Sequence, residues 1–138
     1  MSALSAEQRA FLAANIVGVL ATRAADGDVR QSLVYYALAG DELLITTLAG
    51  RGKSRDVASS SWASMCVMGH EPPYPSLTVS GAAELRTSAI GPPTALVMQR
   101  IMGADEPPEP QSDEALAGVG RVLLAIRIDR VGPAAYIS

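Results

Sequence analysis

Apolar and polar residues alternate most regularly between residues 77 and 85. Leu77, Val79 and Leu85 fall on one face of this stretch, and Thr78 and Glu84 fall on the other. A period of two residues is typical of a β-strand with one buried face. Five further stretches are rich in apolar residues and are bounded by turn residues, which predicts more strands. They cover residues 16–22, 29–38, 43–47, 63–68 and 122–131.

The turns between these stretches predict how the first three strands connect. Asp26-Gly27 and Gly40-Asp41 are turn signals between consecutive strands, so residues 16–47 are expected to form a three-stranded antiparallel meander. Residues 16–22 are almost wholly apolar, which favours a strand covered on both faces. Three prolines in residues 71–75 remove ladder donors and separate the next two strands.

Short helices are predicted between the strands. Ser5 and Gln8 have the spacing of a capping box, which predicts a first helix from about Ser5 to Asn15. Pro92-Pro93 can open a helix that runs through Met102 and ends at Gly103. The acidic, proline-rich residues 104–112 are expected to form a mobile loop. Together these elements predict a mainly β, closed or partly closed small barrel with short helices.

Length and composition support one domain over residues 1–138. The chain is 49% hydrophobic and 18% charged, which is typical of a globular protein with a core. No apolar run is long enough for a membrane helix, and no signal pattern opens the sequence, so a cytoplasmic location is expected. The single cysteine, Cys66, lies in an apolar stretch and is expected to be a buried thiol.

The net charge of −3 is unevenly distributed. Residues 104–114 carry five acidic and no basic side chains, so the rest of the chain has a small excess of basic residues. This balance suits a small anionic ligand, whereas a nucleic-acid surface would normally show a basic stripe and a high isoelectric point.

The stretch from Leu43 to Arg55 carries the main candidate chemistry. A predicted strand runs into Gly50 and Gly52, and Arg51, Lys53 and Arg55 then bring three cations within five residues. A helix beginning near Gly52 would expose free N–H groups that attract anions. The stretch therefore predicts either a phosphate-binding turn or an ordinary solvated basic turn, and the motif alone leaves both open.

Residues for self-sufficient catalysis are scarce. His70 is the only histidine, and no motif supports a Ser–His–Asp or Cys–His site built on it. No clustered histidines, cysteines or carboxylates predict a metal site. We therefore assign no catalytic or metal-binding residue, and we expect a bound cofactor to carry any reaction.

The order of these signals resembles the flavin- and deazaflavin-binding split β-barrel superfamily that includes pyridoxamine 5′-phosphate oxidase. Within it, the chain is most similar to the members that use the deazaflavin coenzyme F420. The resemblance implies a six- to seven-stranded antiparallel split β-barrel with short flanking helices. It rests on residues 19–22, 26–27, 31–35, 45–47, 50–53 and 77–81.

The resemblance also implies a homodimer with two cofactor sites at the subunit interface. The cofactor phosphate would meet the turn of Arg51 and Lys53, and Thr46 and Thr47 would offer hydroxyl and backbone contacts. Three residues of the second strand would lie along the isoalloxazine-like ring, and one residue of the proline-rich loop would reach the site from the other subunit. These four are Gln31, Ser32, Leu33 and Tyr74.

The function that this resemblance implies is an F420-dependent reductase, which passes a hydride from reduced deazaflavin to an unsaturated or conjugated organic substrate. Two alternatives stay open: an FMN-dependent oxidoreductase using the same site, and a non-catalytic carrier of flavin or haem. The C-terminal arginine and histidine segment of the vitamin oxidases is missing from residues 132–138, so that activity is not expected.

Overall fold

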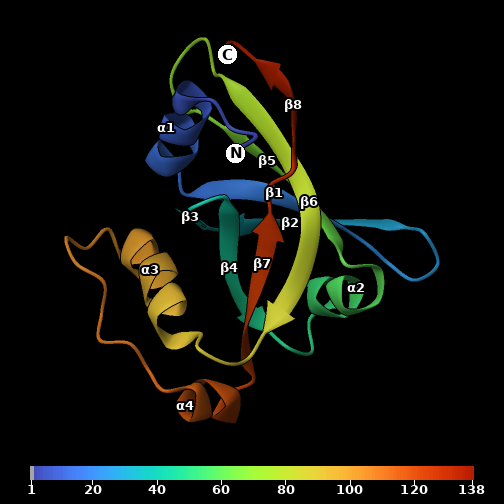
Figure 1. Cartoon of the computed structure of the whole chain (residues 1–138), viewed down its shortest axis with the longest axis vertical. Coiled ribbons are helices and arrows are strands. Elements are labelled where there is room, and N and C mark those ends of the chain that lie inside the picture. The colour runs from blue at the N-terminus through green and yellow to red at the C-terminus, as the bar shows by residue number, and fades with distance from the viewer. Residues whose placement is uncertain (1) are drawn as a thin grey trace.

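The computed structural model describes residues 2–138, and Met1 of the expected domain lies outside the described residues. Over these residues the chain forms eight strands and four short helices, so the expected mainly β class with short helices is confirmed (Figure 1). The helices are α1 (Ala6–Ala14), α2 (Gly52–Ser60), α3 (Gly91–Met102) and α4 (Asp113–Gly118). The strands are β1 (Val17–Arg23), β2 (Val29–Tyr35), β3 (Ala37–Ala39), β4 (Glu42–Leu48), β5 (Trp62–Met68), β6 (Ser76–Arg86), β7 (Arg121–Arg127) and β8 (Arg130–Ala135).

All strand pairs are antiparallel, and the sheet order is β2-β1-β5-β6-β7-β4-β3 with β8 also paired to β6. The eleven-residue strand β6 connects the two halves of this curved sheet. Its first part pairs with β5 and β8, and residues 83–86 pair with β7. Figure 1 shows β6 running along most of the length of the half-barrel.

The predicted alternation along β6 is confirmed, because Leu77, Val79 and Ala83 are buried. They belong to the larger of two apolar clusters, which fills the space between the two halves of the sheet. A smaller cluster lies between the other face of β4 and β7 and helices α3 and α4, and it includes Leu44 and Leu123.

The expected meander is wrong, because the predicted strand 29–38 is two strands. The break falls at Tyr36, which is fully buried, donates its backbone N–H to Ile16 and its hydroxyl to the carbonyl of Leu12. Beyond this residue the chain leaves β2 and enters β3, which pairs with β4 in the other half of the barrel. β2 and β4 therefore share no ladder.

The predicted strand 122–131 is also two strands, which raises the number from the expected six or seven to eight. Ile128 and Asp129 leave the ladder of β7, and their N–H groups donate to the carbonyls of Asp41 and Ser80. The chain then turns onto β6 as β8. An apolar stretch alone does not show such a change of partner.

The helices agree with the expectations, with one addition. Ser5 and Gln8 form both hydrogen bonds of a capping box at α1, and Gly103 ends α3 in the left-handed conformation with φ +64°. α4 was not predicted; its N-cap is Ser112, whose hydroxyl accepts from the N–H of Ala115. Residues 104–112 run between α3 and α4 without helix or strand and are largely exposed. None of the helices among the described residues could span a membrane.

The sheet half formed by β2, β1 and β5 keeps its outer face open in the single chain. Val17 and Val19 of β1 are only half-buried, whereas the alternate residues are buried, so the expected cover on both faces is not provided by this chain. Cys66 lies on the same outer face, where it pairs with Val19, and is exposed. The expectation of a buried thiol is therefore wrong, because the side chain points away from the core.

Candidate functional site

The turn between β4 and α2 presents free backbone donors. Arg51 is the N-cap of α2, and its side chain makes no capping hydrogen bond. The N–H groups of Ser54 and Arg55 both donate to the carbonyl of Arg51. Within the described residues, the N–H groups of Gly52 and Lys53 have no protein acceptor. Such free donors, together with the helix dipole, favour an anion at this end.

Side-chain hydrogen bonds hold this turn in shape. The hydroxyl of Ser54 donates to the carbonyl of Leu48 at 2.8 Å, and the guanidinium of Arg55 donates to the carbonyl of Gly50 at 2.7 Å. These bonds tie the first turn of α2 back to the end of β4 and to the turn that follows it. The free N–H groups therefore belong to an ordered turn.

The cations predicted from the sequence do gather at this helix end. Arg51 is exposed and Lys53 is half-buried. Burial lowers the pKa of the Lys53 amine, and the positive charges of Arg51 and Arg30 lower it further. A bound anion would offset this repulsion and raise the pKa of Lys53 again.

A cleft of about 260 Å³ begins at this turn and runs between β2 and α3. Ile101 of α3 closes one side of it, and Arg121 of β7 adds a further cation. Its full lining is Leu33, Val34, Tyr35, Thr46, Thr47, Leu48, Arg51, Lys53, Ile101 and Arg121. Apolar side chains thus line the β2 side, and cationic side chains line the helix end. That arrangement suits a ligand with a flat apolar part and an anionic part.

Thr46 and Thr47 lie on opposite faces of β4 and both reach the cleft. Thr47 is buried, with 4% of its surface exposed. The hydroxyl of Thr46 is buried and has no hydrogen-bond partner among the described residues. Because a buried polar atom without a partner costs free energy, this hydroxyl marks a position where a ligand group would be stabilising.

Five of the eight residues expected at the cofactor site line this one cleft: Leu33, Thr46, Thr47, Arg51 and Lys53. Gln31 and Ser32 lie on the same strand as Leu33 but outside the lining. Gln31 is exposed on the outer face, and Ser32 is half-buried. Tyr74 lies in the loop before β6, is 52% exposed and does not line the cleft.

Arg121 and Ile101 were not expected at the site. Both come from segments far from the β4–α2 turn in sequence, and neither belongs to a motif. Arg121 reaches the cleft because it is the ladder partner of Leu48, the last residue of β4. Only the pairing of β4 with β7 could have revealed it, and the sequence predicted a different neighbour for β4.

A second cavity, of about 340 Å³, lies between β4 and the helices α3 and α4 and shares Thr46 and Arg121 with the cleft. It is lined mostly by apolar side chains such as Met98 and Leu116. Because Arg51 and Lys53, at the helix end with the free N–H groups, line the cleft and not this cavity, the cleft is the candidate cofactor site. No group of three or more metal-ligating side chains occurs among residues 2–138.

The comparisons with known proteins identify the family of the chain. The sequence profile of the family described as pyridoxamine 5′-phosphate oxidase matches residues 4–132, so the chain belongs to this family. No curated protein matches the chain by sequence.

Solved structures share the fold at low sequence identity. A structure described as an F420 reductase is 24% identical, with a TM-score of 0.73 and coverage of 94% of this chain and 98% of that one. An FAD-binding protein from Mesorhizobium loti is 24% identical, with a TM-score of 0.70 and coverage of 93% and 92%. A haem storage protein from Vibrio cholerae is 16% identical, with a TM-score of 0.68 and coverage of 97% and 96%.

Proposed function

We propose that the cleft binds a phosphate-bearing flavin or deazaflavin and that the protein is an F420-dependent reductase. The observation that carries this proposal is the convergence of Arg51, Lys53 and two free N–H groups at the helix end of a cleft whose β2 side is lined by apolar residues. The family is that of a flavin-type oxidase, and the fold is shared with a structure described as an F420 reductase.

In this proposal each group has a stated role. Lys53, Arg51 and the N–H groups of Gly52 and Lys53 hold the cofactor phosphate through charge-assisted hydrogen bonds. The hydroxyl of Thr46 gains the partner that it lacks in the free protein. Leu33, with Gln31 and Ser32 beside it, lies along the ring.

When bound, the reduced cofactor supplies a hydride for an unsaturated or conjugated organic substrate. The chain contributes orientation and exclusion of water from the ring.

The outer face of β2, β1 and β5 supports assembly as a homodimer. Val29, Leu33 and Tyr35 of β2 are 59%, 75% and 47% exposed on this face, which is a large apolar area for a free surface. In the dimer this face meets its counterpart in a second copy, and Tyr74 of that copy reaches the ring. Residues 1–138 then act as one cofactor-binding domain whose site is completed by its partner.

FMN is the second candidate cofactor, because an anchor for a phosphate suits both molecules and the matched family is named for a flavin-type oxidase. A titration of the pure protein with F420, FMN and haem distinguishes an F420-dependent enzyme from an FMN-dependent enzyme and from a haem carrier. We expect F420 to bind most tightly and the reduced form to be consumed in the presence of an enone or quinone acceptor. If FMN binds more tightly than F420, the cofactor is assigned as FMN. A Soret band with haem, together with no binding of F420 or FMN, would contradict both proposed enzyme functions.

A further inference from the structure

Arg30 of β2 lies directly over the first residue of α2. A Cβ atom added to Gly52 would lie 2.4 Å from the Cζ of Arg30, so only glycine leaves room for the guanidinium here. Arg30 does not line the 260 Å³ cleft, yet its charge lowers the pKa of Lys53. The guanidinium therefore sits next to the helix end that carries the free N–H groups.

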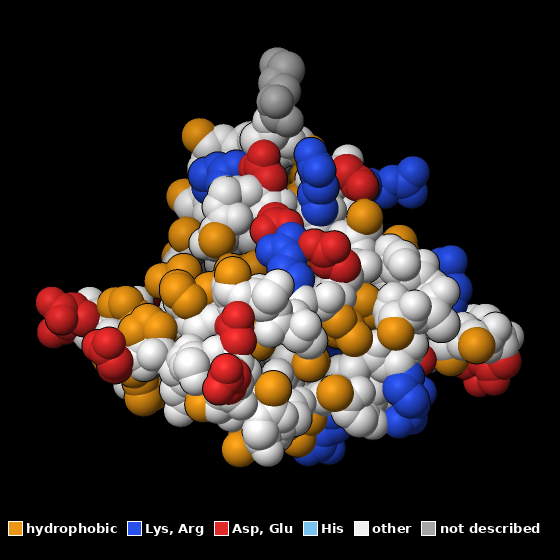
Figure 2. All heavy atoms as spheres, turned by 60° about the horizontal axis from the view of Figure 1, so that its bottom comes forward, with side chains coloured by type: hydrophobic (Ala, Val, Ile, Leu, Met, Phe, Trp, Pro, Cys, Tyr) orange, Lys and Arg blue, Asp and Glu red, His pale blue; other side chains and the backbone are white. Residues whose placement is uncertain are grey.

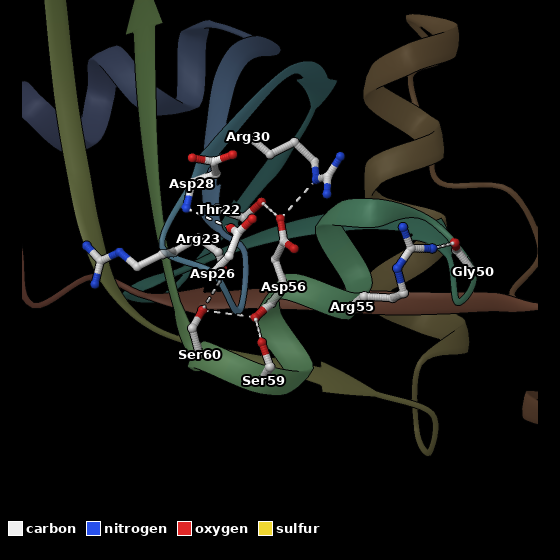
Figure 3. Close-up of polar contacts among 10 residues, drawn as sticks. All are labelled: Thr22, Arg23, Asp26, Asp28, Arg30, Gly50, Arg55, Asp56, Ser59 and Ser60. Atoms are coloured by element: carbon white, nitrogen blue, oxygen red, sulfur yellow. Dashed lines mark hydrogen bonds and ion pairs between the residues drawn. The ribbon is translucent and has the colours of Figure 1, made fainter.

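A buried carboxylate fixes the orientation of this guanidinium. Asp56 of α2 is 4% exposed, and its Oδ2 accepts from Nε of Arg30 at 3.0 Å and from the hydroxyl of Thr22 at 2.8 Å (Figure 3). Burial alone would raise the pKa of Asp56, but these two hydrogen bonds and the charges of Arg30 and Arg55 outweigh it, and the pKa lies below its ordinary value. Asp56 is thus an anion at neutral pH.

The ion pair uses only one edge of the arginine. Among the described residues, Nε is the only side-chain atom of Arg30 that donates to a protein acceptor, and the two terminal amino groups make no such bond. The side chain of Arg30 is 46% exposed, whereas that of Asp56 is 5% exposed. An arginine needed only to neutralise Asp56 could direct two of its nitrogen atoms toward the carboxylate and form two hydrogen bonds. In Arg30 the two terminal amino groups instead remain free beside Gly52.

We propose that Arg30 is a further phosphate-binding residue of the cofactor site and that Asp56 is its positioning residue. The inference rests on the proposed function, because it requires the phosphate to lie at the N-terminus of α2. Arg30 then completes a set of three cations, with Arg51 and Lys53, around the two free N–H groups. The absence of a side chain at Gly52 leaves the space that the guanidinium occupies.

The first test compares cofactor affinity for the wild type, Arg30→Gln, Arg30→Lys and Arg23→Gln. Arg23 is the matched control, because it is also a cation on a neighbouring strand, but it packs over the ring of Trp62 at 4.6 Å and points away from α2 in Figure 3. We expect Arg30→Gln to weaken the cofactor by about tenfold, which corresponds to about 1.4 kcal/mol. Arg30→Lys should recover only part of this loss, because a lysine cannot bridge Asp56 and a phosphate with one planar group.

The second test separates positioning from a general effect on folding. Asp56→Asn should weaken the cofactor severalfold in the wild-type background and leave its affinity unchanged in the Arg30→Gln background. The melting temperature is measured for all four proteins. If Asp56→Asn weakens binding equally in both backgrounds, Asp56 acts through the fold and the positioning role is wrong.

The outcomes distinguish this inference from the proposed function. If Arg30→Gln binds the cofactor as tightly as the wild type while Lys53→Met does not, the phosphate site stands and Arg30 has no part in it. If neither substitution changes the affinity, the phosphate does not bind at this helix end, and both proposals are wrong.

Discussion

At the residue scale, Lys53 and Arg51 are expected to contribute unequally to cofactor binding. Lys53 is half-buried and Arg51 is exposed, so the charge of Arg51 is better screened by water. We expect Arg51→Met to weaken cofactor binding less than Lys53→Met, and the double variant to be weakest. Raising the salt concentration should reduce the affinity of the wild type more than that of either variant, measured by fluorescence titration. Equal salt dependence in all four proteins would show that these charges do not meet the ligand.

Asp56 should also stabilise the fold, independently of any ligand. Asp56→Asn keeps the shape but removes the charge that Arg30 and Thr22 bind, and hydrogen bonds to charged groups contribute about 1.5 to 3 kcal/mol. Because Arg30 is half-exposed, we expect a loss near the lower end of that range in denaturant unfolding.

The pH dependence of that loss follows from the lowered pKa of Asp56. A carboxyl group whose folded pKa lies below its unfolded value stabilises the fold above the unfolded pKa, here near 3.8. The difference between wild type and Asp56→Asn should therefore be constant from neutral pH down to about pH 5. It should shrink as the pH falls below 4 and through the folded pKa. A difference that grows toward acid pH would contradict the assigned ionisation.

At the scale of elements, the acidic loop between α3 and α4 should be dispensable for folding. Its residues are largely exposed, although Gln99 donates to the carbonyls of Ala104 and Asp105. Figure 2 shows acidic side chains at the left edge of the molecule with no basic side chain beside them, and further acidic side chains elsewhere on this face. The loop forms a projecting strap on the same side in Figure 1.

We expect replacement of residues 104–110 by a neutral glycine–serine linker to change the free energy of unfolding by about 0.5 kcal/mol or less. Gln111 is retained because its carbonyl lies against Gly91, and Ser112 is retained because it is the N-cap of α4. Thermal unfolding gives the comparison. A fall in melting temperature of many degrees would show that the loop is packed, and its predicted mobility would then be wrong.

The elements themselves show how far sequence patterns reach. Local signals were sufficient for α1, for α2 and for the alternation along β6, because caps, glycines and period-two burial act within a few residues of each element. They were insufficient at Tyr36 and at Ile128, where the chain changes partner strand. The hydrogen bonds that make those breaks go to Leu12, Ile16 and Asp41, which lie far away in the sequence.

The same limit applies to the candidate site. The β4–α2 turn with Arg51 and Lys53 was predicted from one continuous stretch. Arg121 and Ile101 were missed, because only the pairing of β4 with β7 and the packing of α3 bring them to the cleft. Arg30 lies in a predicted strand, but its relation to Gly52 and Asp56 is visible only in three dimensions.

At the scale of the whole molecule, the exposed apolar face of β2 should mediate a dimer. We expect Val29→Glu to shift the protein from dimer to monomer, because it places a charge in the interface. Val119→Glu is the matched control, since Val119 is 67% exposed but lies outside this face, between α4 and β7. Light scattering at micromolar concentration measures the oligomeric state of the three proteins. A monomeric wild type would contradict the proposed interface, and so would a dimer that is lost only in Val119→Glu.

The central claim is that the helix end at Lys53 anchors the phosphate of a flavin-type cofactor. Its most direct test is a titration of F420 and FMN into the wild type, Lys53→Met and Lys53→Arg at low salt. Lys53→Met keeps the apolar stem and removes the charge, so the fold should persist. We expect Lys53→Met to bind about 10- to 100-fold more weakly than the wild type, with Lys53→Arg close to the wild type. If Lys53→Met binds both cofactors as tightly as the wild type, the β4–α2 turn is an ordinary basic turn and the claim is wrong.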